Sequence, residues 1–177
     1  MSTFAFAQCD QNITLSSQEN VNDFVTDYGC TVINGNFTIE GDGIVDLSAL
    51  SGITSIEDTL YISGNDVLTN IDGLNNLNSI GNIIISDNAS LTNINVFNNI
   101  SSIGENIFIS YNPALTTVDG LNNLNSIEGN LWIYKNNILN NIDGLSNLIS
   151  IGGFLSISNN FYLTSIDGLS NLTSIGG

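Results

Sequence analysis

Residues 107–130 read IFISYNPALTTVDGLNNLNSIEGN, and residues 131–154 read LWIYKNNILNNIDGLSNLISIGGF. The two stretches share one pattern, in which apolar residues, an asparagine and an Asp-Gly pair recur at matching positions. The pattern extends in both directions, and its strand-like triplets begin at residues 37, 60, 83, 107, 131 and 155. An internal repeat of 23 or 24 residues is typical of a solenoid, in which each unit forms one turn.

Each unit is too short to bury its own apolar residues, so these must pack on the matching residues of the next unit. Isoleucine dominates the apolar positions, and Asp-Gly or Gly-Asn pairs stand at the expected corners, which favours short strands and turns. We therefore predict an all-β repeat solenoid, a coil of parallel strands with about six turns. Matching residues of neighbouring turns should lie about 4.8 Å apart.

The chain divides into three predicted parts: a signal-peptide remnant (1–8), an N-terminal cap with one helix (9–36) and the repeat solenoid (37–177). In the remnant, Ala5 and Ala7 have the spacing of a signal-peptide cleavage site. The last repeat has no predicted cap. We therefore expect the natural protein to continue, or this end to meet a partner.

The predicted helix lies between Ser16 and Gly29. Ser16 and Glu19 fit a capping box, and Gly29 is the expected stop. Apolar residues follow a helical spacing between them: Val21, Phe24, Val25 and Tyr28. This apolar stripe should cover the open end of the first turn.

The two cysteines, Cys9 and Cys30, both precede the repeats and predict a disulfide across the cap. Closing a loop of about 20 residues would stabilise the fold by roughly 3 kcal/mol. A disulfide implies an oxidising compartment, so we expect a secreted or cell-surface protein.

Composition excludes several classes of function. The formal net charge is −16, and Lys135 is the only basic residue. Such a chain repels nucleic acid and anionic lipid, and no apolar run approaches the roughly 20 residues needed to span a membrane. Without histidine, neither a Ser–His nucleophile nor a conventional zinc site can form. Only a carboxylate pair such as Asp119 and Asp143 could act in catalysis, but both obey the repeat, so we predict no enzyme activity.

The preferred site is an aromatic group on the outer face of the strands. The middle residue of each triplet should point away from the core, because strand side chains alternate. Exposed aromatic patches commonly mark binding sites. The alternative is that the sheet face tolerates aromatics or that a further segment covers them. The predicted ligand-binding residues are Phe108, Tyr111, Trp132, Tyr134 and Lys135 on two adjacent turns, with Tyr61 further along.

A second candidate is the acidic column Asp72, Asp119, Asp143 and Asp167, with Asn95 on one turn. Oxygen ligands suit calcium, so calcium is the one cofactor that the sequence leaves open. We favour the alternative that each Asp caps backbone amides of its turn.

Two asparagine columns are predicted to be structural, because stacked amides can bond to each other and to the backbone. The first is Asn65, Asn88, Asn112, Asn136 and Asn160, and the second is Asn76, Asn99, Asn123, Asn147 and Asn171.

The repeat pattern GNxxIxxNxxLTxIDGLxNLxSIGG resembles the receptor L-domain type of leucine-rich repeat. The leader 13–18 and the segments 29–31 and 35–39 fit the same family, so the resemblance covers about residues 9–177. Such domains occur in growth-factor receptors, fungal cell-wall proteins and surface proteins of Bacteroidetes-type bacteria, and the bacterial group is most similar. The resemblance implies a right-handed, β-helix-like or leucine-rich-repeat-like solenoid, an extracellular location and ligand binding, and it supplies no catalytic residues.

Together these features predict a non-catalytic recognition or adhesion module that binds a glycan or a protein on a cell surface. The first alternative is a structural spacer or assembly element that associates end to end through its open C-terminal coil. A third is ice binding by a threonine column: Thr69, Thr92, Thr116 and Thr164, with Asn140 on one turn.

Overall fold

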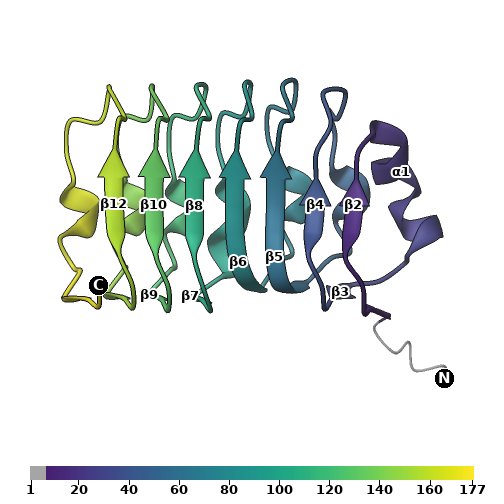
Figure 1. Cartoon of the computed structure of the whole chain (residues 1–177), viewed down its shortest axis with the longest axis horizontal. Helices are drawn as coiled ribbons and strands as arrows, with labels where there is room; N and C mark the ends of the chain where they lie inside the picture. The colour runs from purple at the N-terminus through teal and green to yellow at the C-terminus, as the bar shows by residue number, and fades with distance from the viewer. Residues whose placement is uncertain (1–6) are drawn as a thin grey trace.

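The computed structural model describes residues 7–177 and shows a stack of coils along one long axis (Figure 1). Each coil contributes one strand to a large parallel sheet. In order along the stack these strands are β2 (Ile13–Leu15), β4 (Phe37–Ile39), β5 (Ser55–Ser63), β6 (Ser79–Ser86), β8 (Ile107–Ser110), β10 (Leu131–Tyr134) and β12 (Leu155–Ser158).

Strand pairing follows the sequence repeat. Leu131 lies opposite Ile107 on one side and Leu155 on the other. The first residue of each triplet likewise pairs with the first residue of the next triplet throughout β4, β5, β6 and β8. The parallel sheet of repeated strands predicted from the sequence is confirmed.

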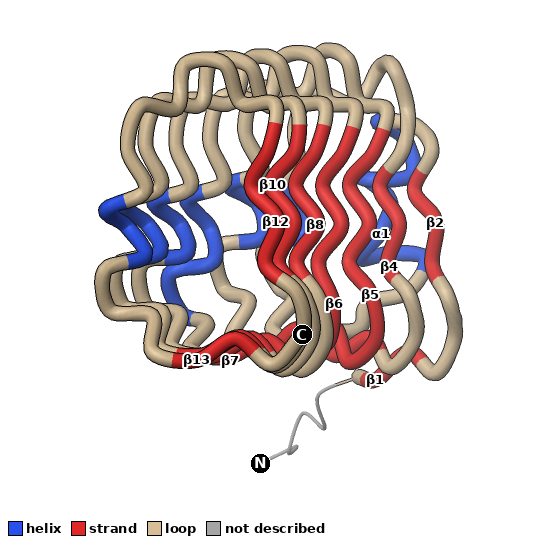
Figure 2. The backbone as a smooth tube through the Cα atoms, turned by 60° about the vertical axis from the view of Figure 1, so that its left-hand side comes forward, coloured by secondary structure: helices blue, strands red, loops and turns tan. Residues whose placement is uncertain are grey.

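The rest of each coil closes behind this sheet (Figure 2). Short 3-10 turns form the side opposite the large sheet: η1 (Ser48–Leu50), η2 (Asp72–Leu74), η3 (Asn95–Asn99), η4 (Asp119–Leu121), η5 (Asp143–Leu145) and η6 (Asp167–Leu169). A second parallel sheet runs along a third side: β7 (Ser102–Ile103), β9 (Ser126–Ile127), β11 (Ser150–Ile151) and β13 (Ser174–Ile175). In the earlier coils β5 and β6 are long and bend, so that each runs along both this third side and the large sheet. The first part of β5 pairs with β3 (Val32–Ile33), which pairs in turn with β1 (Gln8–Cys9).

The core consists of the stacked apolar columns, and the buried asparagine column joins the coils at one corner. Asn112 has no exposed surface. Its Nδ2 donates to the carbonyl oxygens of Ile85 and Ser110, each at 3.0 Å, and its Oδ1 accepts from the backbone N–H of Asn88 at 3.2 Å. The same contacts recur along the column, which confirms its predicted structural role.

The N-terminal helix forms, but two details of its prediction were wrong. Helix α1 (Gln18–Asp27) has Ser17, not Ser16, as its N-cap, because the Ser17 hydroxyl accepts from the Asn20 N–H at 3.2 Å. Val25 is 64% exposed, since only a narrow stripe with Val21 and Phe24 faces the coil beneath. The predicted stop is confirmed: Gly29 has a positive φ of 60°.

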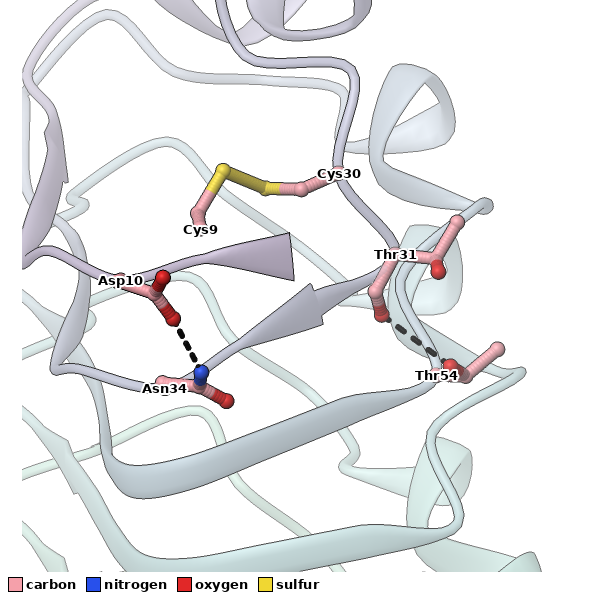
Figure 3. Close-up of a disulfide and its surroundings, with 6 residues drawn as sticks. All are labelled: Cys9, Asp10, Cys30, Thr31, Asn34 and Thr54. Atoms are coloured by element: carbon pink, nitrogen blue, oxygen red, sulfur yellow. Dashed lines mark hydrogen bonds between the residues drawn. A yellow bond between two sulfur atoms is a disulfide. The ribbon is translucent and has the colours of Figure 1, made fainter. Parts of the chain in front are cut away.

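The segment before residue 37 also contributes strands. Strand β2 pairs with β4. Helix α1 packs on η1 and so takes the place that a 3-10 turn has in the later coils. The predicted disulfide joins Cys9 in β1 to Cys30, just after the helix (Figure 3). Of the predicted signal-peptide remnant, residues 1–6 lie outside the described residues, and Gln8 already belongs to β1. Within residues 7–177, no helix combines the length and the apolar character needed to cross a bilayer.

Candidate ligand-binding site

The outer face of the large sheet carries a column of half-buried side chains that runs across the coils. Strand pairing places Tyr61, Ile84, Phe108, Trp132 and Ser156 in register, one from each coil. The strand neighbours of Tyr61, Ile84, Phe108 and Trp132 on the other face are buried, as the alternation of a strand requires. Tyr61 is separated from Phe108 by the coil that carries Ile84, so the structure does not bring Tyr61 next to the other predicted residues.

Phe108 and Trp132 form an aromatic pair on adjacent strands. Their ring centroids lie 5.1 Å apart with an interplanar angle of 46°. Aromatic pairs at this separation stabilise by about 0.5–1.5 kcal/mol beyond the area they bury. Both rings remain partly exposed, so the pair offers an apolar platform on the sheet surface.

Tyr111, Tyr134 and Lys135 form a second group at the ends of the same two strands. The tyrosine rings pack edge to face with centroids 5.4 Å apart. Lys135 Nζ lies 4.9 Å from the Tyr111 ring centroid and 5.2 Å from that of Tyr134, which is cation–π geometry. Its ammonium also donates to the Tyr111 hydroxyl at 3.5 Å.

The two groups share one face of β10, because Tyr134 follows Trp132 by two residues. We call the five residues together the aromatic–lysine patch: Phe108, Tyr111, Trp132, Tyr134 and Lys135. The structure therefore brings together five of the six residues that the sequence selected.

The backbone at two patch residues adopts a conformation that side chains rarely hold. Tyr111 and Lys135 have positive φ angles of 56° and 53°. For a residue with a Cβ this left-handed conformation costs roughly 1–2 kcal/mol, and Asn and Asp tolerate it best. The matching residues of other coils are of the tolerant kinds: Gly64, Asp87 and Asn159. Sequence reasoning missed this column, although its Gly, Asp and Asn residues were the available signal.

A hollow of about 330 Å³ opens beside the patch. It lies among the loops that follow the carboxyl ends of β5, β6, β8 and β10, the loops above the arrowheads in Figure 1. Its polar walls are two acids and an amide that sequence reasoning did not select, Asp66, Asp87 and Asn137. Tyr111 and Lys135 of the patch line it too, and Ala89 and Pro113 supply apolar surface.

Comparison with known families identifies the fold. The model of the Receptor L domain family matches residues 29–119, which is 91 of the 177 residues. The chain belongs to the Receptor L domain family. No curated protein and no solved structure gives a significant match to it.

Membership in this family agrees with three predictions. Receptor L domains are extracellular modules that bind ligands and are not enzymes. The disulfide fits an extracellular location, and the predicted absence of enzyme activity agrees with the family. Family membership also supports a protein partner at a coarse level. The match includes Phe108 and Tyr111, whereas Trp132, Tyr134 and Lys135 of this L domain lie on the coil just after it.

The electrostatics of the patch depend on Lys135. The adjacent Lys135 ammonium is the main cause that lowers the pKa of the Tyr134 phenol below its ordinary value. In return, hydrogen bonding to Tyr134 and then to Tyr111 raises the pKa of Lys135, so the lysine is charged at neutral pH. The one base of this acidic L domain is thus held against two phenol rings.

The Asp side chains of the acidic column do not cap the backbone amides of their turns, so this prediction was wrong. The backbone N–H of Asp143 donates to Asn141 Oδ1 at 3.1 Å, and that of Asp119 donates to Thr117 Oγ1 at 3.1 Å. Each turn is therefore capped by the side chain two residues before the Asp, and the Asp carboxylates stay exposed. Among residues 7–177, no three His, Cys, Asp or Glu side chains lie close enough together to hold a metal ion. The calcium candidates, Asp72, Asp119, Asp143 and Asp167, therefore gain no support from this L domain's geometry.

The threonine column considered for ice binding is exposed, and two of its hydroxyls donate hydrogen bonds to the preceding coil. Thr92 Oγ1 donates to the Thr69 carbonyl at 3.0 Å, and Thr116 Oγ1 donates to the Thr92 carbonyl at 3.2 Å. The hydroxyls of Thr92 and Thr116 therefore link neighbouring coils.

Proposed function

We propose that this receptor L domain is a non-catalytic recognition or adhesion module that binds a glycan or a protein, on a cell surface, through the aromatic–lysine patch. One observation carries the proposal: the patch gathers the only tryptophan and the only base of the chain with three further aromatic rings. Two of its residues hold a costly backbone conformation. Kinship with surface proteins of Bacteroidetes-type bacteria stays a prediction.

The energetics of such a patch suit ligand binding. Tryptophan and tyrosine are the residue types most often found at energetic hot spots of interfaces, since they bury a large area with few rotatable bonds. The Phe108–Trp132 pair and the Tyr111–Tyr134 pair hold one another in place before a ligand arrives. A preorganised surface loses less conformational entropy on binding.

A binding screen against polysaccharides, cell surfaces and secreted proteins tests the proposal. The wild-type domain is compared with the double variant Trp132→Ala, Tyr134→Ala and with the control Phe154→Ala. Phe154 is also an exposed aromatic, at 61%, but it precedes β12 and lies outside the patch. We expect the double variant to lose at least about tenfold in affinity, as for removal of hot-spot aromatics, and the control to bind like wild type.

Circular dichroism confirms that each variant is folded. The proposal fails if the double variant and the control bind every ligand of the screen as wild type does, or if the wild type binds none of them.

A second candidate function is supported by the apolar residues of the last coil, 155–177. Leu155, Ile157 and Leu163 stand in columns that are fully buried in earlier coils, yet they are only partly buried here. Phe161 and Ile175 are 81% and 48% exposed. We propose that this face can pack end to end against a second copy of the chain.

Light scattering over a range of protein concentrations tests this assembly. Self-association that Phe161→Glu and Ile175→Glu abolish would support it, whereas a monomer at all concentrations would exclude it.

A further inference from the structure

We infer that the ligand is a neutral, hydroxyl-rich glycan and that the hollow beside the patch is the subsite for one of its sugar units. This inference rests on the proposed function and goes beyond it by choosing a ligand class. Three properties of the hollow carry it: its lining chemistry, its continuity with the aromatic platform, and the presence of both carboxylates and an ammonium in its lining.

The lining offers what a sugar ring requires. Two carboxylates, Asp66 and Asp87, come from neighbouring coils and can each accept hydrogen bonds from hydroxyl groups. Asn137 adds an amide that both donates and accepts. Pro113 and the Tyr111 ring provide apolar surface for the C–H groups of a sugar. The volume, about 330 Å³, lies at the small end of the range for small-molecule sites, roughly 300–1,000 Å³.

The hollow and the platform form one continuous surface. Tyr111 lines the hollow and also packs against Tyr134. Tyr134 in turn shares its strand face with Trp132, about 7 Å along β10 by the rise of a strand. A glycan with one unit in the hollow can therefore lay its next units on the partly exposed rings of Trp132 and Phe108.

Charge selects a neutral ligand over an acidic or a basic one. The whole chain carries a net charge of −16, so a polyanionic glycan is repelled. A basic peptide would be drawn toward Asp66 and Asp87, but the Lys135 ammonium lies in the same hollow and opposes a second cation. Hydroxyl groups bind these carboxylates without either penalty.

Fluorescence of Trp132 and calorimetry measure the binding directly. The probes are neutral oligosaccharides of glucose, mannose, galactose and N-acetylglucosamine, beside oligogalacturonate as an acidic glycan and decalysine as a basic peptide. The test variant is Asp66→Asn, Asp87→Asn, in which asparagine keeps the side-chain size and tolerates the positive φ of residue 87. The control is Asp23→Asn, an exposed acid on helix α1.

We expect at least one neutral oligosaccharide to bind wild type. The test variant should bind it about tenfold or more weakly, since charged hydrogen bonds are lost, and the control within about twofold of wild type, as for a distant surface charge. Binding should also change less than about twofold between 50 and 500 mM salt, because the ligand carries no charge.

Three results would overturn the inference. These are no binding of any neutral oligosaccharide, equal oligosaccharide binding by wild type and test variant, or salt-sensitive binding of decalysine alone. If a secreted protein still binds and depends on Trp132 and Tyr134, the glycan inference fails while the proposed function stands. If no ligand depends on those two residues, both fail.

Discussion

Tyr111 and Lys135 illustrate how a single backbone angle bears on function. Their left-handed conformation costs roughly 1–2 kcal/mol each. Their contacts return no more than this cost: about 0.5–1.5 kcal/mol for the edge-to-face tyrosine pair and about 0.5–1 kcal/mol for an exposed cation–π contact. Because these contacts do not outweigh the cost of the conformation, stability does not explain why a tyrosine and a lysine stand where other coils have Gly, Asp or Asn.

The double variant Tyr111→Asn, Lys135→Asn tests this balance. Asparagine fits the left-handed conformation, so we expect the free energy of unfolding to stay within about 1 kcal/mol of wild type while ligand affinity falls about tenfold or more. Urea denaturation and the binding screen measure the two quantities. A loss of stability above about 3 kcal/mol would show that the two residues serve the fold.

The phenol of Tyr134 should titrate early. Because the Lys135 ammonium favours the phenolate, the pKa of Tyr134 lies below its ordinary value. We expect Lys135→Met to raise the Tyr134 pKa, and ultraviolet absorbance of the phenolate, with Tyr134→Phe as the reference, to record the change. An unchanged alkaline titration in Lys135→Met would contradict the contact between the Lys135 ammonium and the Tyr134 phenol.

For single residues, the sequence was sufficient to place Trp132 and Tyr134 on the outer face of the large sheet, because strand alternation depends only on position in the repeat. It did not show that residues 111 and 135 have positive φ. A tyrosine and a lysine carry no sign of that conformation, and only their counterparts Gly64, Asp87 and Asn159 do.

Among the elements, the 3-10 turns depend on a glycine that permits close stacking. A Cβ on Gly144 would lie 2.1 Å from the Val118 carbonyl oxygen of the preceding coil. Two coils have a side chain in this place. Ala49 stands in η1, which follows helix α1 and not another 3-10 turn in the stack. Val96 stands on a turn that is stacked on another, and that turn is longer, η3 spanning Asn95–Asn99.

Gly144→Ala should lower the free energy of unfolding by about 1–3 kcal/mol, because the backbone must shift to relieve the clash. Gly43→Ala is the matched control, since a Cβ there meets nothing within 4 Å, and it should change stability by at most about 0.5 kcal/mol. Equal stability of the two variants in urea would contradict the close stacking of the turns.

Substitutions in the buried asparagine column should also lower the free energy of unfolding. Asn112→Ala removes the Nδ2 hydrogen bonds to the Ile85 and Ser110 carbonyls and leaves the Asn88 N–H without its partner. The Ser110 carbonyl keeps the Asp87 N–H as a donor. Each unsatisfied buried group costs about 1–3 kcal/mol, so we expect several kcal/mol in all. Asn160→Ala, at the half-exposed end of the column, should cost less. Similar losses at both sites would show that burial does not set the cost.

Helix α1 shows the limit of sequence reasoning for an element. Ser16 and Ser17 are both suitable caps, and the sequence alone does not choose between them; the contact of Ser17 with Asn20 does. The exposure of Val25 depends on how the helix sits on the first coil, which is a property of the packing and not of the helical spacing.

For the whole molecule, the repeat determined the parallel stack, because matching residues can be buried only against each other. The hollow could not be predicted in the same way. Its walls come from four coils and from the loop residues that vary most between repeats, such as Asp66, Asp87 and Asn137. Its existence depends on the shape of those loops, which the repeat pattern does not describe.

The most direct test of recognition by the aromatic–lysine patch uses the only tryptophan of the chain, Trp132. Its emission and its quenching by acrylamide are measured as each ligand found in the screen is added. We predict a shift of the emission to shorter wavelength and reduced quenching, with saturation at the ligand concentration that saturates binding. A ligand that binds while the emission and quenching of Trp132 remain unchanged would contradict recognition through the patch.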